Sequence, residues 1–133
     1  MSEVFLDTVG LLALWDEDDQ WHADAASAFA RLAGANTRLV TTTFVLLECG
    51  NAAARRPYRR RVHALRQTMA ARGEVLAPTE DDSQAAWSAY DRGEANNAGI
   101  VDHVSFVVMR RLGLTQAFTN DRHFQAAGFE VLF

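Results

Sequence analysis

Short apolar segments alternate along the chain with longer segments in which apolar residues recur at helical spacing. The short segments end in polar or turn-forming residues, which is typical of strands, whereas the longer ones favour helices packed on one face. The predicted strands are residues 3–8, 38–42, 74–78, 116–121 and 129–133. The predicted helices are residues 9–19, 22–34, 44–56, 59–73, 79–93 and 99–113.

Several residues at the ends of these segments support the predicted boundaries. Thr42 or Thr43 is positioned to cap the third helix, and Thr79 to cap the fifth, because a threonine hydroxyl can accept from a free backbone N–H of the first turn. Gly34 and Gly73 stand where a helix ends in a left-handed residue. The boundaries therefore have local physical causes as well as periodicity.

The alternation of strands and helices predicts the fold class. Short apolar strands joined by helices form a parallel sheet that is covered on both faces. We therefore expect an α/β protein with a central, mostly parallel five-stranded sheet flanked by helices. In such sheets ligands bind beyond the carboxyl ends of the strands, so residues that directly follow strands deserve the closest inspection.

Composition narrows the possible functions. The chain has 133 residues, is 49% hydrophobic and carries a formal charge of −4, which fits one globular domain spanning residues 1–133 and argues against non-specific binding to duplex DNA. All 13 basic residues are arginines, which excludes mechanisms that need a lysine. We see no secretion signal and no apolar run long enough for a membrane, and the lone Cys49, expected in the core, fits a reducing compartment. We expect a cytoplasmic protein that makes no membrane contact.

Four carboxylates stand at chemically informative positions. Asp7 ends the first strand, Asp102 opens the helix "GIVDHVSFVVMRRLG", and Asp121 follows the strand "AFT". Each of these also has an ordinary explanation as a turn former or helix cap. Glu48 is more unusual, because it lies in the apolar helical segment "FVLLECGN". If the four converge, their mutual repulsion requires a cation or bound protons, and oxygen ligands suit Mg²⁺ or Mn²⁺.

These segments resemble a known family. Their residues and spacing are similar to those of the PIN-domain ribonucleases, especially the VapC-type toxins of toxin–antitoxin pairs. The segments that carry this similarity are "FLDTVGLLAL", "LLECGN", "GIVDHVSFVVMRRLG" and "AFTNDRHFQAAGFEVL". The resemblance covers nearly the whole chain and is most specific from Ile100 to Leu132. Val9 departs from it, since many relatives carry a small polar residue there. This departure concerns one hydrogen bond around the metal ligands and not the metal site itself.

The resemblance implies a fold, an activity and partners. It implies a PIN-like three-layer sandwich that hydrolyses RNA with one or two Mg²⁺ or Mn²⁺ ions and leaves 5′-phosphate and 3′-hydroxyl ends. It also implies a small cognate antitoxin of the VapB kind and a homodimer. The residues at the family's metal-binding and catalytic positions are Asp7, Glu48, Asp102 and Asp121. The candidates for hydrogen-bonding these ligands are Thr8, Asn51, Ser105 and Thr119, for each of which ordinary capping or packing is an equally good explanation.

Other residues leave alternatives open. The only basic cluster, "RRPYRRR", either contacts RNA phosphates or an acidic partner segment, or is a solvated helix face. Its candidate contact residues are Arg55, Arg56, Arg59 and Arg60. We assign His103 and His123 structural or surface roles. Trp15, Trp21 and Phe44 belong either to the core or to an apolar groove for an antitoxin segment.

Other functions compete with that of a nuclease toxin. A phosphatase or dehalogenase of the strand-aspartate type, or a phosphoacceptor receiver domain, needs a lysine that this chain lacks. A non-catalytic binding module with the same fold usually has lost site acids, whereas all four are present here. A housekeeping PIN nuclease without an antitoxin stays open, and a small neighbouring reading frame with an apolar and acidic tail would favour the toxin.

Overall fold

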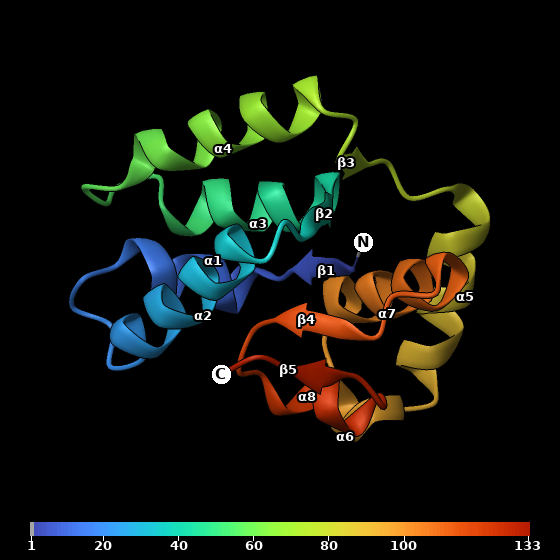
Figure 1. The fold of residues 1–133 in the computed structure, drawn as a ribbon. Helices are drawn as coiled ribbons and strands as arrows, with labels where there is room; N and C mark the ends of the chain where they lie inside the picture. The colour runs from blue at the N-terminus through green and yellow to red at the C-terminus, as the bar shows by residue number, and fades with distance from the viewer. Residues whose placement is uncertain (1) are drawn as a thin grey trace.

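The central sheet has five strands, as the alternation predicts. A computed structural model describes residues 2–133. The strands are β1 (Glu3–Leu6), β2 (Arg38–Thr42), β3 (Val75–Leu76), β4 (Gln116–Phe118) and β5 (Glu130–Val131). They lie in the order β3-β2-β1-β4-β5, and every neighbouring pair is parallel (Figure 1). The predicted α/β class is therefore confirmed, with a sheet that is entirely parallel.

Helices connect the strands and cover the sheet, giving the three-layer arrangement (Figure 1). The helices within residues 2–133 are α1 (Thr8–Trp15), α2 (His22–Gly34), α3 (Thr43–Ala52), α4 (Arg59–Ala71), α5 (Glu80–Asp91), α6 (Glu94–Asn97), α7 (Ile100–Leu112) and α8 (Arg122–Ala126). None of the helices in this range is long and apolar enough to cross a membrane.

The predicted helix ends are mostly confirmed. Thr42 caps α3 by accepting from the Val45 N–H at 3.2 Å, and Thr79 caps α5 in a capping box. Gly73 has a φ of 68°, as expected of a residue that ends a helix. The prediction for Gly34 is wrong: this residue is still helical, and Asn36, with a φ of 54°, takes the left-handed conformation after α2. Asparagine tolerates that conformation because its short polar side chain can bond locally.

The core is built around the central strand β1 and its neighbour β4. Phe5 and Leu6 of β1, Phe118 of β4 and Phe106 of α7 are all at most 1% exposed. Cys49 is buried in this core, as predicted. Three aromatic residues were expected either in the core or in an apolar groove. Trp15 is buried and Trp21 is 43% exposed. Phe44 is partly buried and packs against a smaller cluster of Ala86, Val104 and Val108.

A close contact between α1 and β4 defines the edge where the polar residues gather. A Cβ atom at Gly10 would lie 2.1 Å from the backbone oxygen of Phe118, so only glycine fits there. The register pairs Leu6 with Phe118, which brings the residues after β1 and β4 side by side. The carboxyl ends of these two strands therefore form a common polar edge covered by the start of α1.

Candidate metal centre

Asp7 is the most deeply buried carboxylate at this edge. It follows β1 directly and caps α1, because its side chain accepts from the Val9 N–H at 3.3 Å. The Thr119 hydroxyl donates to the same carboxylate at 2.9 Å. Asp7 is 1% exposed, and burial together with the negative charge of Asp102 raises its pKa to about 8. Such a group is protonated at neutral pH unless positive charge arrives beside it.

Asp102 lies in the first turn of α7 and is not its cap. The N-cap residue is Gly99, and the Asp102 carboxylate accepts no hydrogen bond within residues 2–133. Partial burial, followed by the charges of Asp121 and Glu48, raises the pKa of Asp102 to about 6. Its oxygens are therefore free to bind a ligand, and the surrounding negative charge favours a cation.

Asp121 and His123 lie beside Asp102. One potential ligand atom from each of these three residues lies within 4.8 Å of the others. Asp121 caps the short helix α8 by accepting from the His123 N–H at 2.9 Å, and its Oδ1 atom is 2.8 Å from the His123 Nδ1 atom. The Asp121 carboxylate raises the pKa of His123. The group combines two carboxylates with one imidazole at the edge of the sheet.

His123 is the residue of this group that the sequence reasoning did not assign to the site. Only a structural or surface role was expected for it, whereas the structure places its ring against the Asp121 carboxylate. Its position two residues after Asp121 could have indicated this contact, since a helix cap and the residue two positions later lie in the same turn. His103, by contrast, is 2% exposed within the α7 packing, and burial lowers its pKa.

Glu48 borders the group from α3. The Thr8 hydroxyl donates to its Oε1 atom at 2.7 Å, which links α3 to the start of α1. Its charge contributes to the raised pKa of Asp102, and the charge of Asp102 in turn contributes to that of Asp7. The structure thus brings all four predicted acids to one edge of the sheet. Asp102 and Asp121 form the tight pair of the four; the charge of Glu48 acts on Asp102, and the charges of Asp102 and Asp121 act on Asp7.

The residues expected to support the ligands have different positions. Thr8 and Thr119 each donate a hydrogen bond to a site carboxylate, at 2.7 and 2.9 Å respectively. The Thr119 hydroxyl also accepts from the Asp121 N–H at 3.1 Å, so it connects two acids. Ser105 is fully buried, and its hydroxyl has no hydrogen-bond partner within residues 2–133, whereas Asn51 is exposed on α3.

The basic cluster lies on the connection between α3 and α4 and on the first turn of α4. Its candidate contact residues Arg55, Arg56, Arg59 and Arg60 are all exposed. Arg56 pairs with Asp16 at 3.2 Å and lies 5.8 Å from the centre of the Tyr58 ring. The cluster is therefore available to a partner, with one of its members held in place by the protein.

Comparison with known proteins identifies relatives over nearly the full chain. Residues 4–130 match the family described as "PIN domain". Two strains of Mycobacterium tuberculosis, CDC 1551/Oshkosh and H37Rv, have a protein named "23S rRNA-specific endonuclease VapC20", which is 30% identical over 131 residues and 95% of each chain.

Solved structures show the same relationship. The crystal structure of M. tuberculosis VapC20, titled a "Sarcin-Ricin loop cleaving toxin", has a TM-score of 0.77 at 29% identity and covers 95% of each chain. The structure titled "DNA bound VapBC from Salmonella typhimurium" has a TM-score of 0.64 at 18% identity, covering 98% of this chain and 97% of that one. The second match shows a common fold.

Proposed function

The chain belongs to the PIN-domain family, as a nuclease toxin of the VapC type, and from this premise we propose that it hydrolyses RNA with divalent ions held by Asp7, Glu48, Asp102 and Asp121. The observation that carries the proposal is the shared polar edge. There, burial and mutual repulsion raise the pKa of Asp7 to about 8 and that of Asp102 to about 6. At neutral pH Asp7 stays protonated unless positive charge lies beside it, and a bound cation would supply that charge.

The donor set fits a hard divalent cation. The four carboxylates offer oxygen atoms, which Mg²⁺ and Mn²⁺ prefer, and the Asp102 oxygens accept no competing hydrogen bond within residues 2–133. When bound, such an ion supplies a water of lowered pKa and positive charge for the phosphodiester transition state. Asp102 and Asp121 would hold it directly, with Asp7 beside them and Glu48 as a further ligand or as the group that orients water.

The hydroxyls of the site have positioning roles in this proposal. Thr119 donates to Asp7 and accepts from the Asp121 backbone, which fixes the ends of β1 and β4 relative to each other. Thr8 orients the Glu48 carboxylate across the gap between α1 and α3. Such outer contacts set the direction of ligand oxygens and typically change metal affinity about 10- to 100-fold when removed.

The proposal is tested by RNA cleavage under controlled metal conditions. Purified protein is incubated with total RNA in EDTA, then with Mg²⁺ or Mn²⁺ in excess, and the ends of the products are mapped. We expect no cleavage in EDTA, recovery with either ion, and 5′-phosphate ends. The variant Asp121→Asn should stay folded and inactive. Full cleavage in EDTA would reject the metal mechanism, and an inactive wild type in every metal would favour the non-catalytic binding module.

The identity of the relatives suggests the first substrate to try. The VapC20 relatives are named for 23S rRNA, and the VapC20 structure is titled as cleaving the sarcin–ricin loop. We propose a ribosomal RNA loop as the substrate class, because loops present unpaired bases and a deformable backbone to a protein. Primer extension on ribosomal RNA after the incubation should show one dominant cut. Cleavage confined to precursor RNAs would favour the housekeeping alternative.

An antitoxin and a homodimer complete the proposal. A cavity of about 620 Å³ between α3 and α4 is lined by Leu46, Leu47 and Val62 together with Arg59 and Arg66. Leu47 is 67% exposed. Apolar surface beside arginines suits an apolar and acidic segment of the VapB-like kind. Co-expression with the product of a small neighbouring gene should yield an inactive complex, and light scattering should give twice the mass of one chain.

A further inference from the structure

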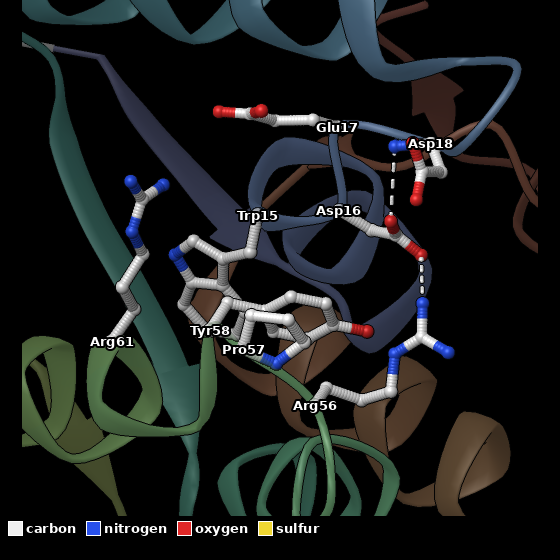
Figure 2. Close-up of a pocket in the computed structure, with 8 residues that line it drawn as sticks. All are labelled: Trp15, Asp16, Glu17, Asp18, Arg56, Pro57, Tyr58 and Arg61. Carbon is white, nitrogen blue, oxygen red and sulfur yellow. Dashed lines mark hydrogen bonds and ion pairs between the residues drawn. The ribbon is translucent and has the colours of Figure 1, made fainter.

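A second cavity lies outside the metal centre, at the far ends of α1 and α3. It has a volume of about 260 Å³. Its walls come from the last residue of α1, the loop that follows it, the connection between α3 and α4, and the first turn of α4 (Figure 2). This volume lies just below the range of roughly 300 to 1,000 Å³ that holds drug-sized ligands, which suits a smaller planar group.

The lining combines aromatic rings with charges of both signs. Trp15 and Tyr58 supply the rings, Arg61 supplies a guanidinium, and Glu17 supplies a carboxylate. In Figure 2, Glu17 and Arg61 lie at the margins of the group of lining residues, and the Trp15 indole lies nearer its centre. Neither Glu17 nor Arg61 forms an ion pair within residues 2–133. Their hydrogen-bonding groups are therefore available to a ligand.

One charge pair is already used to hold the cavity in shape. Arg56 donates to the Asp16 carboxylate at 3.2 Å, and the other oxygen of Asp16 accepts from the Asp18 N–H at 3.0 Å. The same guanidinium lies 5.8 Å from the centre of the Tyr58 ring. These contacts tie the loop after α1 to the connection after α3, so the cavity is preformed.

The chemistry of the lining selects the ligand. The carboxylates of the lining repel a phosphate group, and its arginines repel a metal ion, so neither a phosphate nor a metal ion suits this cavity. An unpaired nucleobase is neutral, stacks on aromatic rings and hydrogen-bonds through its edges. Guanine carries two adjacent N–H donors, N1 and N2, for a carboxylate, and two adjacent acceptors, O6 and N7, for an arginine. No other common base presents both pairs.

We propose that this cavity binds an unpaired guanine of the RNA substrate, with Glu17 accepting from N1 and N2, Arg61 donating to O6 or N7, and Tyr58 and Trp15 stacking on the ring. The inference rests on the proposed ribonuclease function. Trp15 lies seven positions after Thr8, which is beside the metal centre, and this corresponds to about 10 Å along α1 at 1.5 Å per residue. The guanine would thus lie near the cut phosphate and contribute to the choice of site.

Binding in EDTA tests the inference without cleavage. The probes are labelled RNA hexamers of five uridines and one guanosine, or of five uridines and one inosine, which lacks only the N2 amino group. We expect wild type to bind the guanosine hexamer about fivefold more tightly, the effect of one hydrogen bond of about 1.0 kcal/mol. Glu17→Ala should reduce this ratio to about one, whereas Glu80→Ala, an equal charge change on exposed α5, should leave it unchanged.

Trp15 fluorescence gives an independent measurement. In the variant Trp21→Phe/Trp87→Phe, which replaces two exposed residues, Trp15 is the sole tryptophan, and the guanosine hexamer should quench it. Equal affinity of wild type for both hexamers, or a ratio that survives in Glu17→Ala, would overturn the inference. Quenching by the antitoxin but not by RNA would assign the cavity to the protein partner and also overturn it. Cleavage in Mg²⁺, measured separately, shows whether the proposed function itself fails.

Discussion

The buried charge of Asp7 leads to a prediction about stability in the absence of metal. The pKa of this carboxyl is about 8 in the folded protein against an ordinary value of 3.8, because burial and the charge of Asp102 oppose ionisation. The folded state therefore favours protonated Asp7. Its contribution to stability is complete below pH 3.8 and is lost as the pH rises toward 8. Replacing the carboxyl by a neutral amide should remove this loss.

The magnitude follows from the size of the shift. At about 1.36 kcal/mol for each pH unit above 3.8, ionisation of the unfolded chain lowers wild-type stability by about 2 kcal/mol at pH 5, about 4 at pH 7 and about 6 above pH 8. Asp7→Asn has no such dependence, and its amide oxygen can still accept from Thr119 and cap α1. Its advantage over wild type in EDTA should therefore grow by about 4 kcal/mol between pH 5 and pH 9.

Urea unfolding in EDTA at these pH values measures the advantage directly. Asp24→Asn, a change at an exposed position of α2, serves as the control and should show no comparable growth. Added Mg²⁺ or Mn²⁺ should stabilise wild type more than Asp7→Asn, because an ion binds the folded state and Asp7 is among its proposed ligands. An Asp7→Asn advantage that is constant or shrinks with pH would refute the reasoning, since it would mean that Asp7 ionises freely in the fold.

Three further predictions concern the site and its support. Asp102→Asn should melt several degrees higher than wild type in EDTA at pH 8, because it removes a carboxylate whose pKa is raised to about 6. In the same assay, added Mg²⁺ should raise its melting temperature less than that of wild type. A melting temperature below that of wild type in EDTA would show that Asp102 only stabilises its helix. Thr119→Val removes the hydroxyl that donates a hydrogen bond to Asp7, and it should weaken Mn²⁺ binding, measured by calorimetry, about 10- to 100-fold. An unchanged Mn²⁺ affinity would argue against a positioning role for Thr119. Gly10→Ala should lower the free energy of unfolding in urea by roughly 3 kcal/mol or more, because its Cβ would lie 2.1 Å from the β4 backbone. The control Gly50→Ala, in open space on α3, should raise it by about 0.5 to 1 kcal/mol. Equal effects of the two substitutions would contradict the close packing of α1 on β4.

Periodicity predicted the long elements of the fold well. The helix expected at residues 22–34 has those bounds as α2, and Thr79 and Gly73 stand at the predicted ends of α5 and α4. The short helices α6 and α8 were missed, since four or five residues do not complete two turns and carry no readable period. In α6, Ala95 and Asn96 even have left-handed backbone angles, which no propensity favours for alanine.

The site was predictable to the extent that it depends on strand ends. Asp7 and Asp121 follow strands, so their meeting follows from the parallel sheet alone. The inward position of Glu48 was indicated by its apolar surroundings. Asn51 could not be placed, because one step along a helix separates a face toward the site from one toward solvent, and the structure leaves it exposed. His123 was missed because its contact with Asp121 depends on the unpredicted helix α8.

Helix capping and the proposed metal binding are compatible roles for the same carboxylate. Asp7 and Asp121 each use one oxygen to cap a helix, and the other oxygen accepts no hydrogen bond within residues 2–133. Asp102 caps nothing, so its stabilisation by the α7 N-terminus, about 0.3 to 1 kcal/mol, is small beside the burial and the neighbouring negative charges that raise its pKa to about 6. The caps thus hold these two side chains at the edge of the sheet. Without an ion Asp7 stays protonated at neutral pH, at a cost to stability, and in our proposal a bound cation lets it ionise.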